Sequence, residues 1–335
     1  MRTFDYAAPR READVLALRS EEPGQTEILA GGTDLIGLMK AMVVQPRRVV
    51  NIMEVPEFHG IEPLGSGGLQ LGATTHLDEL LESPYLEEYP AIGQAIRGIS
   101  SIQLQCQGTL GGEILQRARC WYFRQGQGLL AHEGRLPAEG DNRYHAIFGN
   151  SGPAKFVCGS RLAPAMIVLG AEARVIGPAG SEDEEIRERW LPVEDLYRAP
   201  RHEGQRETVL EPGQLVTHFR LPAPEGISSG AYEVRHGEGP DYPLMAAAAA
   251  LRISGGVVRE ARVVLGQAAP IPWRSREAEL TVLGGLLTPE LAEAAGEAAA
   301  QTATPLSQNG YKVQLARTAV KRALLLAAGL PTGGF

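Results

Sequence analysis

The sequence contains only three cysteines among 335 residues, and they are widely spaced. A disulfide framework of the kind found in small secreted domains is therefore not expected. Aromatic residues make up only 6% of the chain, and no run of lysine or arginine exceeds two residues. With a net charge of -8, the chain lacks the basic surface that nucleic-acid binding requires. We expect no nucleic-acid partner.

Long apolar runs are also missing. The longest, LMAAAAAL at 244–251, falls far short of the roughly 20 residues that a membrane helix needs. The N-terminal sequence MRTFDYAAPRREADVLALRS carries charges throughout and has no apolar core of a secretory signal. We expect no contact with a membrane and a cytoplasmic location.

The composition that is present, 44% hydrophobic and 21% charged, is typical of a globular protein of two or three domains. Short strand-like and helix-like pieces alternate up to FRLPAPEG at 219–226, whose two prolines mark a domain boundary. Strand patterns follow, with a hairpin turn at SGG, 254–256, and then three helical segments. The acidic run SEDEEIRE at 181–188 is expected to be a solvated surface loop. The strands are short and do not have the long buried runs of a large parallel sheet.

AGGTDL, residues 30–35, lies between a strand pattern and a helix pattern. Consecutive glycines let the backbone approach a ligand closely, and successive N–H groups can bind phosphate oxygens. Thr33 adds a hydroxyl and Asp34 an acceptor. Taken alone, the segment is better explained as a tight strand-to-helix turn without a ligand.

GTLGGEI, residues 108–114, repeats this chemistry. Two such turns could hold one pyrophosphate from both sides. Neither matches G-x-G-x-x-G or G-x-x-x-x-G-K-[ST], which weakens a nicotinamide or nucleoside triphosphate site. A binding site for a dinucleotide such as FAD is still compatible with these two turns.

Together these turns, LQLGATTHLDELL, VVLGQAAPIPWRSREAELTVLGG and NGYKVQLARTAVKRAL resemble the FAD-binding subunit of molybdenum hydroxylases, the xanthine dehydrogenase and carbon monoxide dehydrogenase group. The resemblance covers nearly the whole chain. It implies an α+β fold, with a two-lobed FAD-binding domain of the PCMH type over residues 1–223 and lobes at about 1–55 and 56–223. A smaller C-terminal flavoprotein domain of α+β type would cover 224–335.

The resemblance implies an oxidoreductase subunit that works beside a molybdopterin-binding large subunit and a [2Fe-2S] small subunit. Electrons would pass from molybdenum through the iron–sulfur centres to FAD on this chain, and then to an external acceptor. It implies no catalytic or metal-binding residue here. The implied cofactor-binding residues are Ala30, Gly31, Gly32, Thr33, Asp34, Leu35, Thr109, Gly111, Gly112, Glu113, Ser160 and Arg161.

Three positions depart from the family pattern. Glu113 stands where asparagine is usual, Arg161 where aspartate is usual, and Glu233 matches an expected lysine. A carboxylate beside a diphosphate is unfavourable unless it is neutralised, so we expect Arg161 to pair with Glu113 or to contact a phosphate. The retained glycine turns favour a rearranged but working FAD site over a flavin-free structural subunit. A free-standing flavoenzyme is disfavoured because no substrate site is evident.

The segment RARCWYFRQGQG, 117–128, places Cys120 beside three aromatic residues. Its flanks resemble a branch of the family, aldehyde oxidoreductases included, whose flavin subunit carries a [4Fe-4S] cluster. The other cysteines would lie near Gly128, Leu136 and Ala154, where this chain has none. One thiolate cannot hold such a cluster, so we expect no [4Fe-4S] on this chain and a buried Cys120. Three aromatics should pack the segment onto the FAD domain: Trp121, Tyr122 and Phe123.

Another metal site is not favoured, because the spacing of Cys106, Cys120 and Cys158, with His132 or His145, matches no common pattern. We expect His145 to be a hydrogen-bonded loop histidine. In ATTHLDE we expect Thr75 as a helix N-cap, with His76 at the helix start and Asp78 in the first turn.

Overall fold

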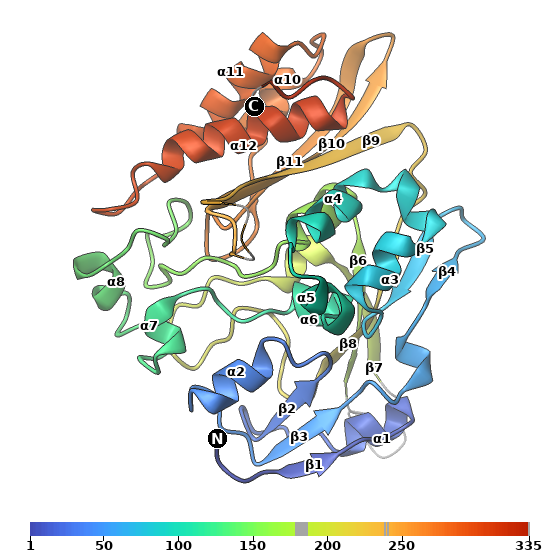
Figure 1. Cartoon of the computed structure of the whole chain (residues 1–335), viewed down its shortest axis with the longest axis vertical. Helices are drawn as coiled ribbons and strands as arrows, with labels where there is room; N and C mark the ends of the chain where they lie inside the picture. Colours follow the sequence, from blue (N-terminus) through green and yellow to red (C-terminus); the bar gives the residue numbers. More distant parts are fainter. Residues whose placement is uncertain (178–186, 238, 240, 334–335) are drawn as a thin grey trace.

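The computed structural model describes residues 1–177, 187–237, 239 and 241–333. Three separate sheets follow one another from the bottom to the top of Figure 1. Within the described ranges, the search for a helix long and apolar enough to cross a membrane finds none. Residues 181–186 of the acidic run lie outside the described residues, and the last two residues of that run begin a strand.

The N-terminal lobe is a three-stranded parallel sheet of order β1-β3-β2, built from β1 (Asp5–Ala7), β2 (Thr26–Leu29) and β3 (Arg48–Asn51). It carries α1 (Glu12–Ala17) and α2 (Leu35–Lys40). Its small core contains apolar residues of 15–58, among them Val50 and Phe58, and is completed by Ile176 and Leu215 from the second sheet. The lobe therefore cannot bury its core with its own residues alone.

The second sheet is antiparallel, in the order β4-β5-β8-β6-β7. Its strands are β4 (Ile61–Pro63), β5 (Leu69–Gly72), β6 (Glu172–Gly177), β7 (Arg187–Pro192) and β8 (Leu215–Leu221). Between β5 and β6 the chain makes a long excursion through short helices. These include α3 (Leu77–Glu82), α4 (Pro90–Gly98), α5 (Ile102–Gln107), α6 (Leu110–Ile114) and α9 (Ala163–Val168).

One local prediction in this region is wrong. The N-cap of α3 is His76 and not Thr75. The Thr75 hydroxyl instead accepts a hydrogen bond from the Gly60 N–H at 2.9 Å, while Glu79 accepts from the His76 N–H at 2.8 Å. Asp78 lies in the first turn of the helix, as predicted.

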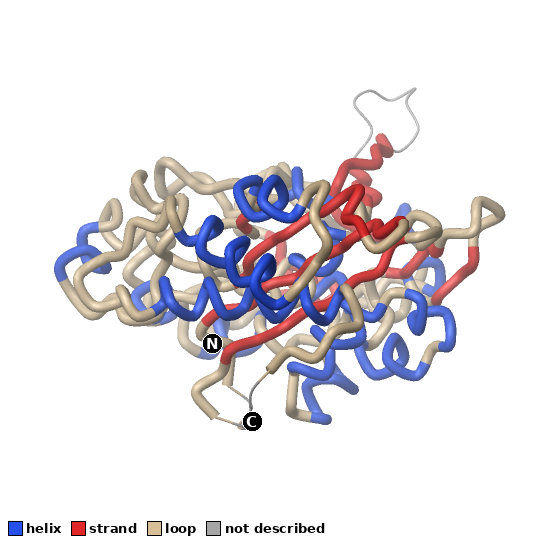
Figure 2. Tube along the Cα trace, turned by 90° about the horizontal axis from the view of Figure 1, so that it is seen from above, coloured by secondary structure: helices blue, strands red, loops and turns tan. Residues whose placement is uncertain are grey.

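The third sheet is antiparallel, in the order β12-β11-β10-β9. It contains β9 (Ile227–Val234), β10 (Met245–Ser254), β11 (Val257–Gly266) and β12 (Trp273–Arg274), and the predicted turn at 254–256 joins β10 to β11. Three helices cover one face (Figures 1 and 2): α10 (Arg276–Val282), α11 (Pro289–Ala300) and α12 (Lys312–Ala327). Helices α4 and α9 contact the same sheet, which is thereby joined to the middle of the molecule.

A buried lysine fixes the start of α12. The Lys312 ammonium is 1% exposed. It donates to the carbonyl oxygens of Tyr144, His145 and Gln267 at 3.4, 3.0 and 2.8 Å. These contacts hold the segment 144–145 against the third sheet, because Gln267 directly follows β11.

We predict that Lys312→Met lowers the free energy of unfolding by about 2–4 kcal/mol, because the buried carbonyls of His145 and Gln267 lose a hydrogen-bond donor. Urea unfolding followed by circular dichroism measures this. Lys321→Met on the same helix is the control, since Lys321 forms an ion pair with Glu293 whose side chain is 64% exposed, and such pairs contribute at most about 1 kcal/mol. Equal losses in the two variants would contradict the role given to Lys312.

Candidate functional site

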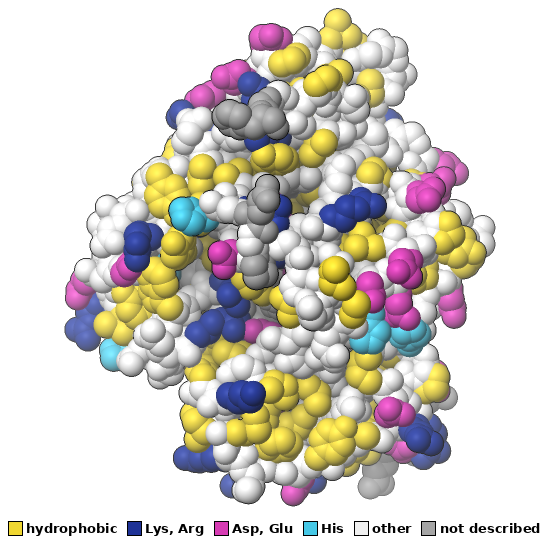
Figure 3. Space-filling model, viewed as in Figure 1, with side chains coloured by type: hydrophobic (Ala, Val, Ile, Leu, Met, Phe, Trp, Pro, Cys, Tyr) yellow, Lys and Arg dark blue, Asp and Glu magenta, His cyan; other side chains and the backbone are white. Residues whose placement is uncertain are grey.

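Both glycine turns line one cleft. Its volume is about 410 Å³, within the range of roughly 300–1,000 Å³ that is typical of ligand pockets. The walls come from β2 and the turn 30–35, from the second turn with Thr109, Gly111 and Gly112, and from the segment 204–216. The face in Figure 3 is hollowed above the N-terminal lobe, and charged side chains gather there.

The first turn supplies free hydrogen-bond donors. Among the described residues, the backbone N–H groups of residues 31–34 donate to no other group of the chain. Gly32 has a φ of +73°, which disfavours other residues. A Cβ at Gly31 would lie 1.9 Å from the carbonyl oxygen of Gln107. The fold therefore requires these glycines for the turn itself, and the turn leaves its N–H groups available to an anion.

The second turn presents backbone surface to the cleft but few free N–H groups. The Thr109 hydroxyl accepts from the Gly112 N–H at 3.2 Å and caps α6. The N–H groups of Leu110 and Gly111 donate to the carbonyls of residues 75 and 73. A Cβ at Gly111 would lie 2.8 Å from the Ala73 Cβ, so this glycine is needed for packing. The exposed Gly112 is the member of the pair where a ligand can approach the backbone.

Asp34 does not offer its carboxylate to the cleft. It precedes α2, where an aspartate usually caps its own helix, but it makes no such bond. One oxygen accepts from Arg124 Nη1 at 2.7 Å and the other from the Arg117 N–H at 3.0 Å. The carboxylate that the sequence analysis offered as an acceptor is thus already paired.

In the described part of the chain, two guanidinium groups of the cleft are not held in ion pairs, on a lining that carries four arginines and five carboxylates. Arg117 pairs with Glu207 and Arg206 with Glu27, both at 2.9 Å. Arg19 and Arg198 also line the cleft, and neither forms an ion pair with a carboxylate of the described chain. Burial lowers the pKa of Arg19 to about 10, which leaves it charged at neutral pH. An anionic ligand would find unneutralised guanidinium groups here.

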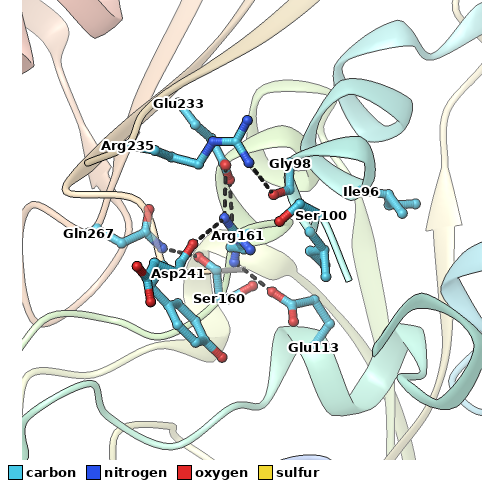
Figure 4. Close-up of polar contacts among 12 residues, drawn as sticks. Ile96, Gly98, Ser100, Glu113, Ser160, Arg161, Glu233, Arg235, Asp241 and Gln267 are labelled. Atoms are coloured by element: carbon cyan, nitrogen blue, oxygen red, sulfur yellow. Dashed lines mark hydrogen bonds and ion pairs between the residues drawn. The ribbon is translucent and has the colours of Figure 1, made fainter. Parts of the chain in front are cut away.

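The three positions that depart from the family pattern lie in one buried network (Figure 4). Arg161 donates from Nε and Nη2 to the two oxygens of Glu233, each at 3.0 Å. Its backbone N–H donates to Glu113 at 2.7 Å. The expected pairing of the Arg161 guanidinium with Glu113 is therefore wrong. The guanidinium is held by Glu233 on β9, and Glu113 receives only the backbone N–H.

None of Glu113, Ser160 and Arg161 is among the residues that line the cleft. The Ser160 hydroxyl accepts from the Ala163 N–H at 2.9 Å at the start of α9. Arg161 borders a second cavity of about 250 Å³ between α4 and β9. Ala30 and Leu35, by contrast, lie on the cleft with the turn between them.

Gln116 connects this network to the cleft, which it lines. Its amide nitrogen donates to Glu113 and its oxygen accepts from the Tyr242 hydroxyl. Gln116 could not be predicted from the sequence, because a single glutamine beyond a glycine turn carries no signal. Burial raises the pKa of Glu113 to about 7, opposed by the hydrogen bond from the Arg161 N–H. Glu113 is thus a buried carboxyl group one residue removed from the cleft wall that titrates near neutral pH.

Cys120 is buried, and its sulfur lies 3.2 Å from His145 Nε2. Burial raises the pKa of the Cys120 thiol and lowers the pKa of His145 to about 4. The pair is therefore neutral, and the thiol is a poor nucleophile. Phe123 packs with Leu38 of α2 and joins the segment to the N-terminal lobe, as expected. Trp121 instead packs within its own region, edge to face against Tyr144.

Other residues, with contacts of their own, occupy the positions where the family branch has cysteines. Ala154 is buried in the same cluster as Cys120, and Leu136 lies in α8 (Arg135–Glu139). Gly128 has a φ of +80°, and a Cβ there would lie 2.8 Å from a carboxylate oxygen of Glu203. Cys106 is exposed and Cys158 is buried. The absence of a [4Fe-4S] cluster stays a prediction, tested by iron analysis of the purified chain.

In the part of the chain that the structure describes, no three His, Cys, Asp or Glu side chains are grouped so that they could hold a metal ion. His132 is exposed, and His145 contacts Cys120 alone of the three cysteines. A carboxylate of Glu203 accepts from the N–H groups of Leu129 and Leu130 at 2.9 and 3.0 Å. These contacts hold the segment after Gly128 by ordinary hydrogen bonds.

Comparisons with known proteins show which proteins this chain is similar to. Residues 2–224 match the family described as the FAD binding domain in molybdopterin dehydrogenase, and residues 230–327 match the CO dehydrogenase flavoprotein C-terminal domain. The aldehyde oxidoreductase FAD-binding subunit PaoB of Escherichia coli is 29% identical, covering 95% of this chain and 96% of its own. The carbon monoxide dehydrogenase medium chain of Afipia carboxidovorans is also 29% identical, covering 96% of both.

Among solved structures, carbon monoxide dehydrogenase from Hydrogenophaga pseudoflava, in a form lacking the Mo-pyranopterin moiety, aligns with a TM-score of 0.75 and 26% identity. The alignment covers 98% of both chains. The α+β fold expected from the sequence is thereby confirmed.

Glu113 generates a prediction for stability against pH. Its pKa in the folded chain, about 7, is above the ordinary 4.5, so its contribution is fully present below pH 4.5 and is lost as the pH rises through 7. Between pH 5 and pH 8.5 the parent should therefore lose stability that Glu113→Gln keeps. The free energy of unfolding of Glu113→Gln should rise by about 2 kcal/mol relative to that of the parent over this range. Urea unfolding at both pH values measures the gain. The exposed Glu87→Gln should follow the parent, and a pH-independent difference for Glu113→Gln would refute the assignment.

Proposed function

Because the chain belongs to the family of FAD-binding domains of molybdopterin dehydrogenases, we propose that it binds FAD in the cleft between its two glycine turns and passes electrons to an external acceptor. The observation that carries this proposal is the meeting of the turns 30–35 and 109–112 on one cleft. These turns come from distant parts of the chain, and one of them has free N–H groups. FAD would supply the electron-carrying chemistry that the side chains here lack.

We propose unequal roles for the two turns. The N–H groups of residues 31–34 would bind the diphosphate oxygens, with Thr33 beside them, because these donors are free. Gly112 and Thr109 would form the opposite wall, where the backbone allows close approach. Arg19 and Arg198 would balance the diphosphate charge across the cleft. Glu113, Ser160 and Arg161 would act behind the wall through Gln116.

We propose that a molybdopterin-binding large subunit and a [2Fe-2S] small subunit are the partners. The names of the relatives support this, since they are an FAD-binding subunit and a medium chain. The division into a FAD-binding domain, 1–223, with lobes at about 1–55 and 56–223, and a C-terminal domain, 224–335, is likewise proposed. The family matches over 2–224 and 230–327 support it. The cytoplasmic location stays a prediction.

A flavin-free structural subunit is the alternative. The departures at Glu113, Arg161 and Glu233 would favour it if they blocked the cleft. They do not line the cleft, and their charges are satisfied within their own network. The absorption spectrum of the purified chain separates the two functions, because flavin bands in the blue region are required by the first and absent in the second.

We predict that Thr33→Glu weakens FAD binding about tenfold relative to Thr33→Gln, which corresponds to about 1.4 kcal/mol. Thr33 is exposed on the cleft, so both variants should fold, and they differ only in the charge placed beside the diphosphate. Titration of the flavin-depleted chain with FAD, followed by flavin fluorescence, gives both dissociation constants. The difference should shrink at high salt. Equal affinities of the two variants would rule out a diphosphate at this turn.

A further inference from the structure

Arg124 is the last residue of α7 (Trp121–Arg124), and all three nitrogens of its guanidinium group donate hydrogen bonds. Nε donates to the carbonyl oxygen of Ala118 and Nη2 to that of Arg117, both at 3.1 Å. Nη1 donates to Asp34 at 2.7 Å. One side chain thus closes the segment 117–124 upon itself and fastens it to the turn 31–34. Arg124 is not among the residues that line the cleft.

Asp34 and Glu207 hold the same segment from two sides. Asp34 also accepts from the Arg117 N–H at 3.0 Å. Glu207 accepts from Arg117 Nε at 2.9 Å and from the Ala118 N–H at 3.0 Å. Arg117 and Glu207 themselves line the cleft. The segment that contains Cys120 is therefore the link between two walls of the cleft.

Both carboxylate oxygens of Asp34 accept hydrogen bonds from the segment 117–124. At the N-cap of α2 it could have bonded its own helix, yet both of its oxygens reach across to the segment 117–124. The ion pair is largely shielded from water, with 22% of the Arg124 side chain and 18% of the Asp34 side chain exposed. A charged hydrogen bond in such surroundings is stronger than one at the surface.

We propose that Arg124 is a positioning residue for the cofactor turn, and that through Asp34 it couples FAD binding to the burial of Cys120. This rests on the proposed function. FAD held by the N–H groups of residues 31–34 would fix Asp34, and Asp34 would fix the segment around Cys120. Because coupling between two sites is reciprocal, loosening that segment must weaken FAD binding.

The first test compares FAD dissociation constants of the flavin-depleted chain. Arg124→Gln should weaken FAD binding at least about tenfold, whereas Arg252→Gln, the matched control, should stay within about twofold. Arg252 forms the same kind of pair, with Glu260 at 2.9 Å, but at the surface and away from the cleft. Arg124→Lys should be intermediate, since an ammonium can reach Asp34 without also holding both carbonyls. Asp34→Asn combined with Arg124→Gln should be no worse than either change alone.

The second test follows Cys120 by labelling with an aromatic disulfide in a Cys106→Ser background, because Cys106 is exposed. Peptide mapping separates Cys120 from Cys158. FAD should slow labelling of Cys120 several-fold in the parent and leave it unchanged in Arg124→Gln, while Cys158 responds in neither. Circular dichroism confirms that each variant is folded, and Arg124→Lys carries the test if Arg124→Gln is not.

The outcomes separate the two hypotheses. A parent that binds no FAD would overturn the proposed function and this inference with it. A parent that binds FAD, with Arg124→Gln binding equally well, would overturn the inference alone. A change in Cys120 labelling without a change in FAD affinity would show that Arg124 is merely structural, and would overturn it as well.

Discussion

The buried ion pair between Arg161 and Glu233 joins the third sheet to the middle of the molecule, where helices α4 and α9 also pack against that sheet. Arg161 lies just before α9, Glu233 lies on β9, and Glu113 on α6 receives the Arg161 N–H. Removing one partner would leave a buried charge uncompensated, at a cost of about 3–5 kcal/mol. The ion pair thus links the third sheet to the helix that follows the second glycine turn, and Gln116, which lines the cleft, hydrogen-bonds Glu113 of that helix.

Structural elements that depend only on neighbouring residues could be predicted from the sequence. The two glycine turns, the hairpin at 254–256 and the three closing helices follow from local signals. That the two turns meet on one cleft could be proposed because they share the same chemistry. Which glycine faces solvent could not, because it depends on Ala73 and Gln107 behind the turns.

Contacts could not be predicted from the sequence where one side chain has several possible partners that are distant in the chain. Arg161 was expected to pair with Glu113 or to contact a phosphate, yet its guanidinium binds Glu233 and only its backbone N–H reaches Glu113. Asp34 was offered to a ligand because it stands in a glycine turn, and the structure gives it to Arg124 instead. Residues far apart in the chain compete in these cases, and spacing contains no information about which one wins.

The N-terminal lobe has a consequence for synthesis. Its strands are three or four residues long, and its core is closed by Ile176 and Leu215. Domains usually fold from the N-terminus as the chain leaves the ribosome, but here the residues made first cannot complete their core until β8 has emerged. The first glycine turn is thus among the earliest parts to be translated, yet the core of its lobe stays incomplete until Leu215 has been made, and Val50 and Phe58 stay without these two partners in the meantime.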